Sequence, residues 1–291
     1  MNRNYRIITD ATADMTPEML IGLPEVDIIP MDITLGEEAY TYGPGGNITV
    51  EEFYAAQRGG KFATTSQINP TVYLEHFEAY LQRGEDVLYL CFTSGLSGTY
   101  QAAVICAEEL QGKYPEGRVV CIDTLCASVG EGFLVREALR KQKEGLTLDE
   151  MVQWVNDHRQ KVCHWFTVDT FEHLKHGGRV SGAAAMMGTL LQIKPMLHVS
   201  MDGKLEVAEK PRGAKRALAA QMARMKKGWT PEEGKLIVVG HGDCLDRAEE
   251  LAAQVKAVYP DTEIYPVPIG PIIGSHTGPG MLALIFWGTE R

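Results

Sequence analysis

Four short segments, each rich in hydroxyl groups and glycine, are the parts of this 291-residue chain whose composition suits ligand binding. They cover residues 64–67, 93–99, 176–179 and 270–280. Each falls where a predicted helix or strand begins or ends, and loops at such places commonly carry binding and catalytic groups. The sequence therefore directs attention to four separate loops rather than to one continuous motif.

The segment 93–99 (Thr-Ser-Gly-Leu-Ser-Gly-Thr) joins an apolar run to a helical pattern. Ligands of open α/β sheets bind beyond the carboxyl ends of the strands, so this loop is the first position to consider. The hydroxyl of Ser94 and the free N–H groups at the start of the following helix favour an anion. Alternatively, Ser97 only caps the helix and the glycines only serve the turn.

Two histidine positions and one arginine could take part in chemistry. His276 stands close to glycines and a proline, which is typical of a histidine displayed on a loop rather than packed in a core. His173 and His176 form an H-x-x-H pair, but no third ligand is evident, so the pattern favours ordinary histidines over a metal site. Arg179 could present its guanidinium to a carboxylate or phosphate, or pair with an acid on the surface.

Common nucleotide-binding and hydrolase motifs do not occur in the sequence. The first predicted strand is followed by Asp-Ala-Thr-Ala-Asp and not by the G-x-G-x-x-G of dinucleotide-binding proteins. A phosphate-binding P-loop and a G-x-S-x-G nucleophile motif are also missing. Asp10 and Asp14 could together chelate Mg²⁺, although Asp14 fits a turn equally well.

Strand and helix patterns alternate through the first half of the chain. Apolar runs at 87–92 and 119–123 indicate buried strands, and helical patterns follow them at 98–111 and 131–143. This alternation predicts a parallel sheet that is covered on both faces.

Three further helix starts are marked by capping boxes or by a proline at the first helical position. They lie at Thr49 with Glu52, at Thr147 with Glu150, and at Pro70. Residues 61–69 are polar and predict a loop.

The second half of the chain has a different pattern, with a hairpin among its strands. The predicted elements are strands at 166–168, 236–240, 263–268 and 281–286, a hairpin at 196–210, a small-residue helix from Ser181, a basic helix at 214–227 and a helix at 245–259. The predicted fold class is α/β with two domains. Residues 1–163 form a parallel α/β domain with a small irregular subdomain at about 31–62, and residues 164–291 form an α+β domain.

Composition argues for a soluble cytoplasmic protein. The net charge is −10, from 28 basic and 38 acidic residues, which disfavours nucleic-acid binding. The apolar run 281–287 is far shorter than the roughly 20 residues that span a bilayer, and the first ten residues lack the apolar stretch of a signal peptide. The six cysteines form no C-x-x-C pair and predict reduced, mostly buried thiols.

Six segments match, in order and along nearly the whole chain, the motifs of one known family. They are residues 9–14 (similar to I-x-D-S-T-A-D), 65–67 (T-S-Q), 94–103 (S-x-L-S-G-T-Y-x-x-A), 175–181 (K-G-G-R-I/V-S), 210–213 (K-x-R-G) and 276–280 (H-x-G-P-G). The chain thus resembles the DegV family. It departs from the family pattern at Ala11, where the family has serine, and at Ile68, where it usually has proline.

The resemblance implies a two-domain, non-enzymatic protein that binds a long-chain fatty acid such as palmitate (hexadecanoate) or oleate, without metal or other cofactor. It implies that the acyl chain lies in a tunnel of the C-terminal domain, where the small-residue helix at 182–191 would form a wall or simply part of the core. The residues expected around the carboxylate are Thr65 and Ser94, with Thr64, Ser66, Gly95, His276 and Arg179.

Some members of the family, called FakB, present the fatty acid to a separate fatty-acid kinase that phosphorylates the carboxylate. The resemblance therefore implies a kinase partner. Arg179 would stabilise the charge of the acyl phosphate, and Arg212, in the basic segment 210–227, would dock the partner.

Two other functions stay open at this point. In the first, Ser94 is a nucleophile and His276 its base in an acyl hydrolase, although no acid adjoins His276 in sequence. In the second, the chain is a small-phosphometabolite binder related to dihydroxyacetone kinase subunits, with His276 forming a covalent hemiaminal.

Overall fold

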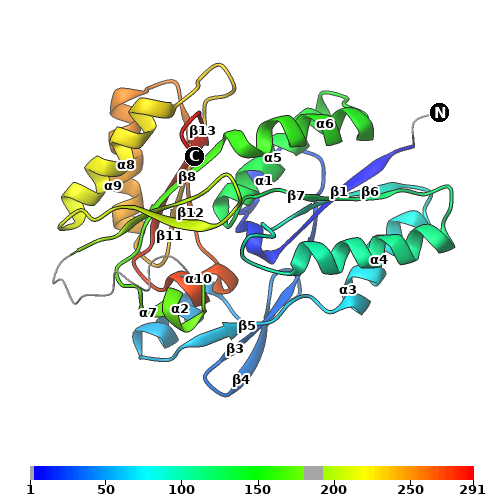
Figure 1. Cartoon of the computed structure of the whole chain (residues 1–291), viewed down its shortest axis with the longest axis horizontal. Helices are drawn as coiled ribbons and strands as arrows, with labels where there is room; N and C mark the ends of the chain where they lie inside the picture. The colour runs from blue at the N-terminus through cyan, green and yellow to red at the C-terminus, as the bar shows by residue number, and fades with distance from the viewer. Residues whose placement is uncertain (1–2, 180–192) are drawn as a thin grey trace.

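The computed structural model describes residues 3–179 and 193–291, whose strands form three sheets (Figure 1). One sheet is parallel, one is mixed and one is a small antiparallel sheet. The helix predicted from Ser181, including residues 182–191, lies outside the described residues. The α/β fold class is confirmed.

The parallel sheet comes from the first half of the chain. Its strands, in spatial order, are β2 (Asp27–Ile29), β1 (Tyr5–Asp10), β6 (Asp86–Cys91) and β7 (Val119–Asp123). Successive side chains along each strand point to opposite faces of the sheet. Tyr89 packs toward α3 (Pro70–Leu81) and α4 (Thr99–Lys113), whereas Leu90 packs toward α5 (Val129–Lys143) and α6 (Leu148–His158). The predicted covering of both faces is confirmed.

The mixed sheet comes from the second half. Its order is β10 (Leu205–Glu209), β9 (Met196–Val199), β8 (Val162–Thr167), β13 (Leu282–Trp287), β11 (Leu236–His241) and β12 (Glu263–Pro268). Only β11 and β12 are parallel, and β9 with β10 forms the predicted hairpin. Helices α8 (Ala214–Gly228) and α9 (Leu245–Val258) cover one face, and α5 packs against the other (Figure 1).

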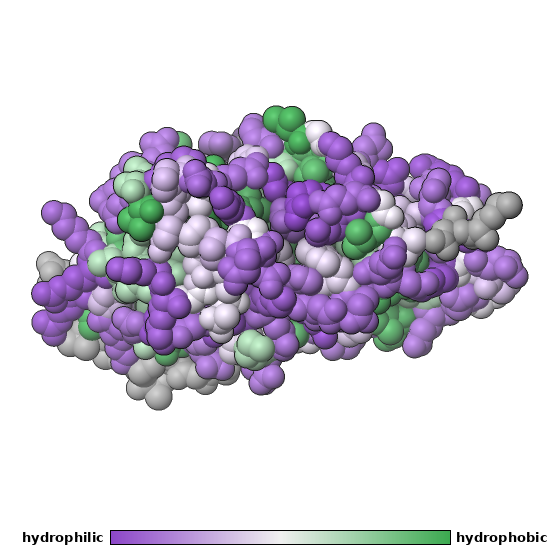
Figure 2. Space-filling view, turned by 90° about the horizontal axis from the view of Figure 1, so that it is seen from above, coloured by the Kyte–Doolittle hydropathy of each residue, from purple (hydrophilic) through white to green (hydrophobic). Residues whose placement is uncertain are grey.

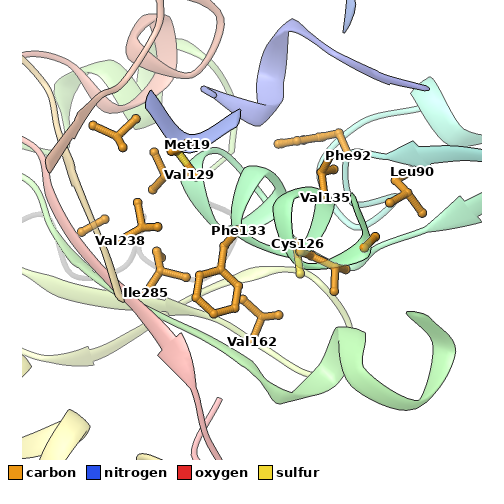
Figure 3. Close-up of a cluster of buried hydrophobic side chains, with 14 of the residues drawn as sticks. Met19, Leu90, Phe92, Cys126, Val129, Phe133, Val135, Val162, Val238 and Ile285 are labelled. Carbon is orange, nitrogen blue, oxygen red and sulfur yellow. The ribbon is translucent and has the colours of Figure 1, made fainter. Parts of the chain in front are cut away.

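Helix α5 lies between the two large sheets. Its first eleven residues are all buried, which is the expected state of a helix covered on every side. Phe133 lies close to Val162 and Ile285 of the mixed sheet, whereas Leu90 of the parallel sheet lies on the other side of α5, closer to Val135 (Figure 3). The two sheets therefore share one core. The predicted division between residues 163 and 164 falls inside β8 and stays a prediction.

The small sheet corrects two expectations. Residues 31–62 are not irregular: β3 (Met31–Leu35) and β4 (Glu38–Tyr42) pair as a hairpin, which Gly36 permits at φ +67°, and α2 (Val50–Arg58) follows with its predicted capping box. Residues 61–69 are not all loop, because β5 (Ala63–Thr65) pairs with β3. A three-residue strand is too short for its alternation to show in sequence.

Short helices connect these layers. They are η1 (Ala11–Ala13), α1 (Pro17–Leu20), η2 (Arg159–Lys161), α7 (Glu172–His176) and α10 (Pro271–Thr277). Helix α10 corrects the expectation of a loop at 270–280: Pro271 starts it, and Gly278, at φ +73°, ends it. The face of the molecule in Figure 2 is mostly hydrophilic, with separate small hydrophobic patches.

Candidate ligand-binding site

A cavity of about 900 Å³, its open mouth included, lies between the two large sheets, the small sheet and α10. Most of its wall is apolar. The apolar lining residues are Met31, Phe92, Leu96, Ala127, Val129, Phe166, Leu174, Val199, Leu205, Ile272, Ile273, Met281, Ala283 and Ile285.

The polar lining residues fall into two groups that come from different elements. The mouth group comes from the end of β5, the loop before α4 with the start of that helix, the loop after α7, and α10. It comprises Thr65, Ser66, Gln67, Ser97, Thr99, Arg179, His276 and Thr277, of which Thr99 and Thr277 are buried. The inner group comprises Thr12, Ser128 and His164, each at most 5% exposed, and lies around the start of α5. Ser66, Gln67 and Arg179 are exposed, so the mouth group meets solvent.

Thr65 and His276, 211 residues apart, meet at the mouth. The distance from Thr65 Oγ1 to His276 Nε2 is 2.9 Å. Thr65 is the last residue of β5, and its register opposite Ile33 turns it away from the face on which Thr64 is exposed. The strand thus selects one of two adjacent threonines for the cavity.

His276 is largely buried in the last turn of α10 and is uncharged at neutral pH. Burial, with the nearby charges of Arg179 and His176, lowers the pKa of His276 to about 4. Its Nδ1 atom is buried and has no hydrogen-bond partner among the described residues. A tautomer with the proton on Nε2 leaves only a bare acceptor unpaired there, which costs less than a buried unpaired N–H.

The loop after α7 holds the other side of His276. Gly177 packs so closely that a Cβ atom on it would lie 2.1 Å from His276 Nδ1. Arg179 crosses the mouth, donating from Nη1 to the carbonyl of Gly177 at 2.5 Å and from Nε to the carbonyl of Leu96 at 3.4 Å. The guanidinium therefore joins two loops at the mouth while its own side chain stays exposed.

The 93–99 loop is fastened to the β9–β10 hairpin. Thr93 Oγ1 donates to the carbonyl of Gly203 at 3.0 Å and accepts from Gly95 N–H at 3.1 Å. A side chain at Gly95 would collide with the carbonyls of the hairpin turn, 2.6–2.7 Å from its Cβ. Ser97 Oγ accepts from Thr99 N–H at 3.3 Å, but the N-cap residue of α4 is Gly98, so Ser97 is not the cap that one interpretation of the sequence expected.

The structure brings some of the predicted site residues together and not others. Thr65, Ser66, Arg179 and His276 line the cavity. Thr64, Ser94 and Gly95 are not among its lining residues. Ser94 and Gly95 nevertheless belong to the 93–99 loop, other residues of which do line the cavity. Arg212 is exposed beside Ile193, outside the cavity wall. The ligand roles of all these residues stay predictions.

Sequence reasoning missed the inner group. Thr12 carried a signal, because it lies in the segment 9–14 that matches a family motif. Ser128 and His164 stand in no motif, and only the packing of α5 against β8 brings them to the cavity: a Cβ on Gly130 would lie 2.0 Å from His164 Nε2. Contacts of this kind depend on tertiary structure.

The mouth has the groups of a carboxylate site rather than those of a hydrolase. The hydroxyl on His276 is that of Thr65, and a histidine with a pKa near 4 is a weak base at neutral pH. The described residues place no acid on Nδ1 to orient the ring. Hydroxyl groups, backbone N–H groups and a guanidinium are, however, the usual partners of a carboxylate.

Within residues 3–179 and 193–291, no group of three or more metal-ligating side chains could hold an ion. His173 and His176 instead pack against Phe62, at ring-centroid distances of 5.0 and 4.8 Å. All six cysteines are free. None of the helices in these two stretches combines the length and apolar character that crossing a membrane requires.

Comparison with known proteins gives consistent matches. A family model described as "Uncharacterised protein, DegV family" matches residues 4–288. A DegV domain-containing protein of Clostridium perfringens is 38% identical over 289 residues, covering 99% of each chain. A fatty-acid-binding DegV family protein from Thermus thermophilus is 31% identical, with a TM-score of 0.86, covering 99% of this chain and 100% of that one.

One further structure shares the fold at lower identity. It is a fatty acid kinase B3 protein of Streptococcus pneumoniae loaded with linoleic acid. It is 20% identical, with a TM-score of 0.85, and the match covers 98% of this chain and 99% of that one.

Proposed function

The chain belongs to the DegV family, and on that premise we propose that it binds a long-chain fatty acid in the cavity. The acyl chain lies along the apolar wall and the carboxylate lies among the mouth group. The observation that carries this proposal is the Thr65–His276 pair at the polar mouth of a mostly apolar cavity.

Apolar burial supplies most of the affinity. Each buried methylene contributes about 0.8 kcal/mol, so a chain of about 16 carbons gains on the order of 12 kcal/mol before the costs of ordering are subtracted. The mouth then needs only to replace the water around the carboxylate, because an ionised group buried without hydrogen bonds is very costly.

A neutral His276 fits this task. With its proton on Nε2, the ring donates to Thr65 Oγ1, whose own proton is then free to point to the carboxylate. Ser66, and Ser94 after a small movement of its loop, add hydroxyl groups. The ligand is therefore held by hydrogen bonds to neutral groups, with Arg179 close to the carboxylate at the solvent side.

We further propose that the protein presents the carboxylate to a fatty-acid kinase. The mouth is open to solvent, and Arg179 is exposed there, where it can stabilise the developing acyl phosphate. Arg212 is exposed close to the start of α8 and is the proposed contact for the partner.

Mass spectrometry of protein purified from bacteria tests ligand binding. A native mass that exceeds the denatured mass by one C16–C18 fatty acid is the expected result. Bare protein that also takes up no added palmitate or oleate would contradict the proposal. Thr65→Val should weaken palmitate binding about 10- to 150-fold, the equivalent of one hydrogen bond to a charged group. Thr64→Val is the matched control, because Thr64 lies on the opposite, exposed face of β5.

Kinase presentation is tested separately with a fatty-acid kinase, ATP and loaded protein. Arg179→Ala and Arg212→Glu should each slow acyl-phosphate formation while palmitate stays bound. Transfer rates that are unchanged in both variants would contradict the kinase role and leave fatty-acid binding standing.

A further inference from the structure

Three acidic side chains that the proposed ligand site does not use are buried together beside the cavity. Asp10 and Glu131 are 0% exposed and Asp14 is 5% exposed. Asp10 ends β1, Asp14 follows η1 and Glu131 lies in the first turn of α5. Burial of carboxyl groups is costly unless each oxygen finds a hydrogen-bond partner, so their contacts show what they hold in place.

Asp10 and Glu131 share the hydroxyl of Thr12. Thr12 Oγ1 contacts Asp10 Oδ1 and, at 2.8 Å, Glu131 Oε2. A hydroxyl has one proton, so it cannot donate to both carboxyl groups. Both contacts are hydrogen bonds only if one of the two carboxyl groups carries a proton. Burial raises the pKa of both groups, and for Glu131 the charge of Asp10 raises the pKa further.

Asp14 connects two elements that line the cavity. Its Oδ1 accepts from the backbone N–H of Gly270 at 2.8 Å, and its Oδ2 accepts from Ser128 Oγ at 2.6 Å. Gly270 is the residue immediately before α10, which supplies His276. Ser128 is the residue immediately before α5 and itself lines the inner cavity.

Backbone strain at Ser128 indicates that the second contact is held by its surroundings. Asp14, with φ 47° and ψ 50°, is in the left-handed helical region, which aspartate tolerates. Ser128, with φ 55° and ψ −141°, has a conformation that residues other than glycine rarely adopt. Such conformations persist where other contacts over-determine them, and they cluster at functional sites. The two residues are 114 positions apart and both are buried.

We propose that Asp14 is a positioning residue of the ligand site. It fixes the start of α10 against the start of α5, and through α10 it sets the position of His276 relative to Thr65. This inference rests on the proposed function for what the site binds. The geometry of α10, however, can be measured without any ligand.

Hydrogen exchange and palmitate affinity of the delipidated protein test the proposal together. Asp14→Ala should speed exchange of the amides of residues 272–277 and weaken palmitate binding by the folded protein about tenfold. Asp14→Asn should restore both, because its carbonyl accepts from Gly270 N–H and its NH₂ group donates to Ser128 Oγ. A merely stabilising role would lower the unfolding midpoint of Asp14→Ala without changing affinity.

Asp86→Ala is the matched control. Asp86 is also buried and accepts a backbone N–H, that of Arg118 at 3.0 Å, but it lies at the start of β6, outside the cavity lining. It should lose stability without faster exchange at 272–277 and without loss of affinity. Equal effects in both alanine variants, or failure of Asp14→Asn to rescue, would overturn the proposal.

The role of Asp14 can still be tested if the wild-type protein binds no fatty acid or if Asp14→Ala does not fold. If wild-type protein binds no fatty acid, the proposed function fails, but the exchange comparison still decides the role of Asp14. If Asp14→Ala does not fold, Ser128→Ala removes the α5 side of the connection and should weaken palmitate binding about threefold. Unchanged affinity in that variant would overturn the proposal.

Discussion

Substitution of Gly177 by alanine should weaken fatty-acid binding by displacing the His276 ring at the mouth. The added Cβ would lie 2.1 Å from Nδ1, 2.9 Å from Cε1 and 3.1 Å from Cγ of His276. A ring is rigid, and three of its atoms are too close, so the imidazole must move as a whole by about 1 Å or more to reach ordinary contact distances.

The size of the effect follows from what that movement breaks. It separates His276 Nε2 from Thr65 Oγ1, now 2.9 Å apart. Thr65 then loses the donor that leaves its own proton free for the carboxylate. If the contact of Thr65 with the ligand is weakened by the worth of one ordinary hydrogen bond, about 0.5–1.5 kcal/mol, affinity falls about 2- to 13-fold. Gly178→Ala is the control: it meets nothing within 4 Å and adds only the strain of its φ of +70°.

The assay is displacement of a fluorescent fatty acid from delipidated protein, carried out as a double-mutant cycle with Thr65→Val. If Gly177→Ala acts through the Thr65–His276 contact, its effect should largely vanish when Thr65 is already valine. The same loss in both backgrounds, or no loss at all, would refute the assignment of that contact to the ligand site.

Three further predictions concern stability and chain length. Burial lowers the pKa of His276 from 6.5 to about 4, so the unfolded chain binds a proton at a higher pH than the folded protein does. The free energy of unfolding should therefore fall by up to about 3 kcal/mol as pH falls from 6.5 to 4. Urea unfolding of His276→Gln should lack this pH-dependent loss. For Asp14 the pH dependence of stability has the opposite sign, because burial, with the nearby charge of Asp10, raises its pKa from 3.8 to about 7. Its contribution of about 4 kcal/mol to the free energy of unfolding is present at low pH and is lost as pH rises to 7. Asp14→Asn should remove this decline. Ala283→Phe fills part of the cavity from β13 and should lower palmitate affinity about fourfold for each methylene group that it excludes. Binding of the shorter decanoate should stay unchanged in the same displacement assay. Equal losses of affinity for both acids would place the acyl chain elsewhere.

Most of the fold could be predicted because its long elements carry strong local patterns. β6 is buried at every residue, as its apolar run indicated, and the capping boxes at Thr49 and Thr147 start α2 and α6 where expected. The failures lie in short elements. β5 has three residues and α10 has seven, so in neither does the alternation of apolar and polar residues repeat often enough to distinguish the element from a loop.

The site was only partly predictable, for a different reason. Motif matches marked Thr65 and His276, but only the fold shows that they touch, since β5 pairs with β3 and α10 packs against β5. Of the two threonines at 64 and 65, the register of β5 decides which one reaches the cavity. Ser128 and His164 reach the cavity only through the packing of α5, and no local sequence pattern indicates that packing.

The distribution of free hydrogen-bonding groups explains which way a fatty acid must lie. At the inner end, the hydroxyl of Thr12 lies between Asp10 and Glu131, and the proton of Ser128 goes to Asp14. His164 is held neutral by burial, which lowers its pKa, and its Nδ1 is 2.9 Å from the carbonyl of Val162. The side chains of these three residues are therefore already engaged with the protein, and the inner wall is a poor place for a carboxylate. At the mouth, Ser66 and the Thr65 hydroxyl can still donate. A carboxylate placed at the inner end would be buried without partners and beside acidic groups, so the acid group of the ligand has to face the mouth.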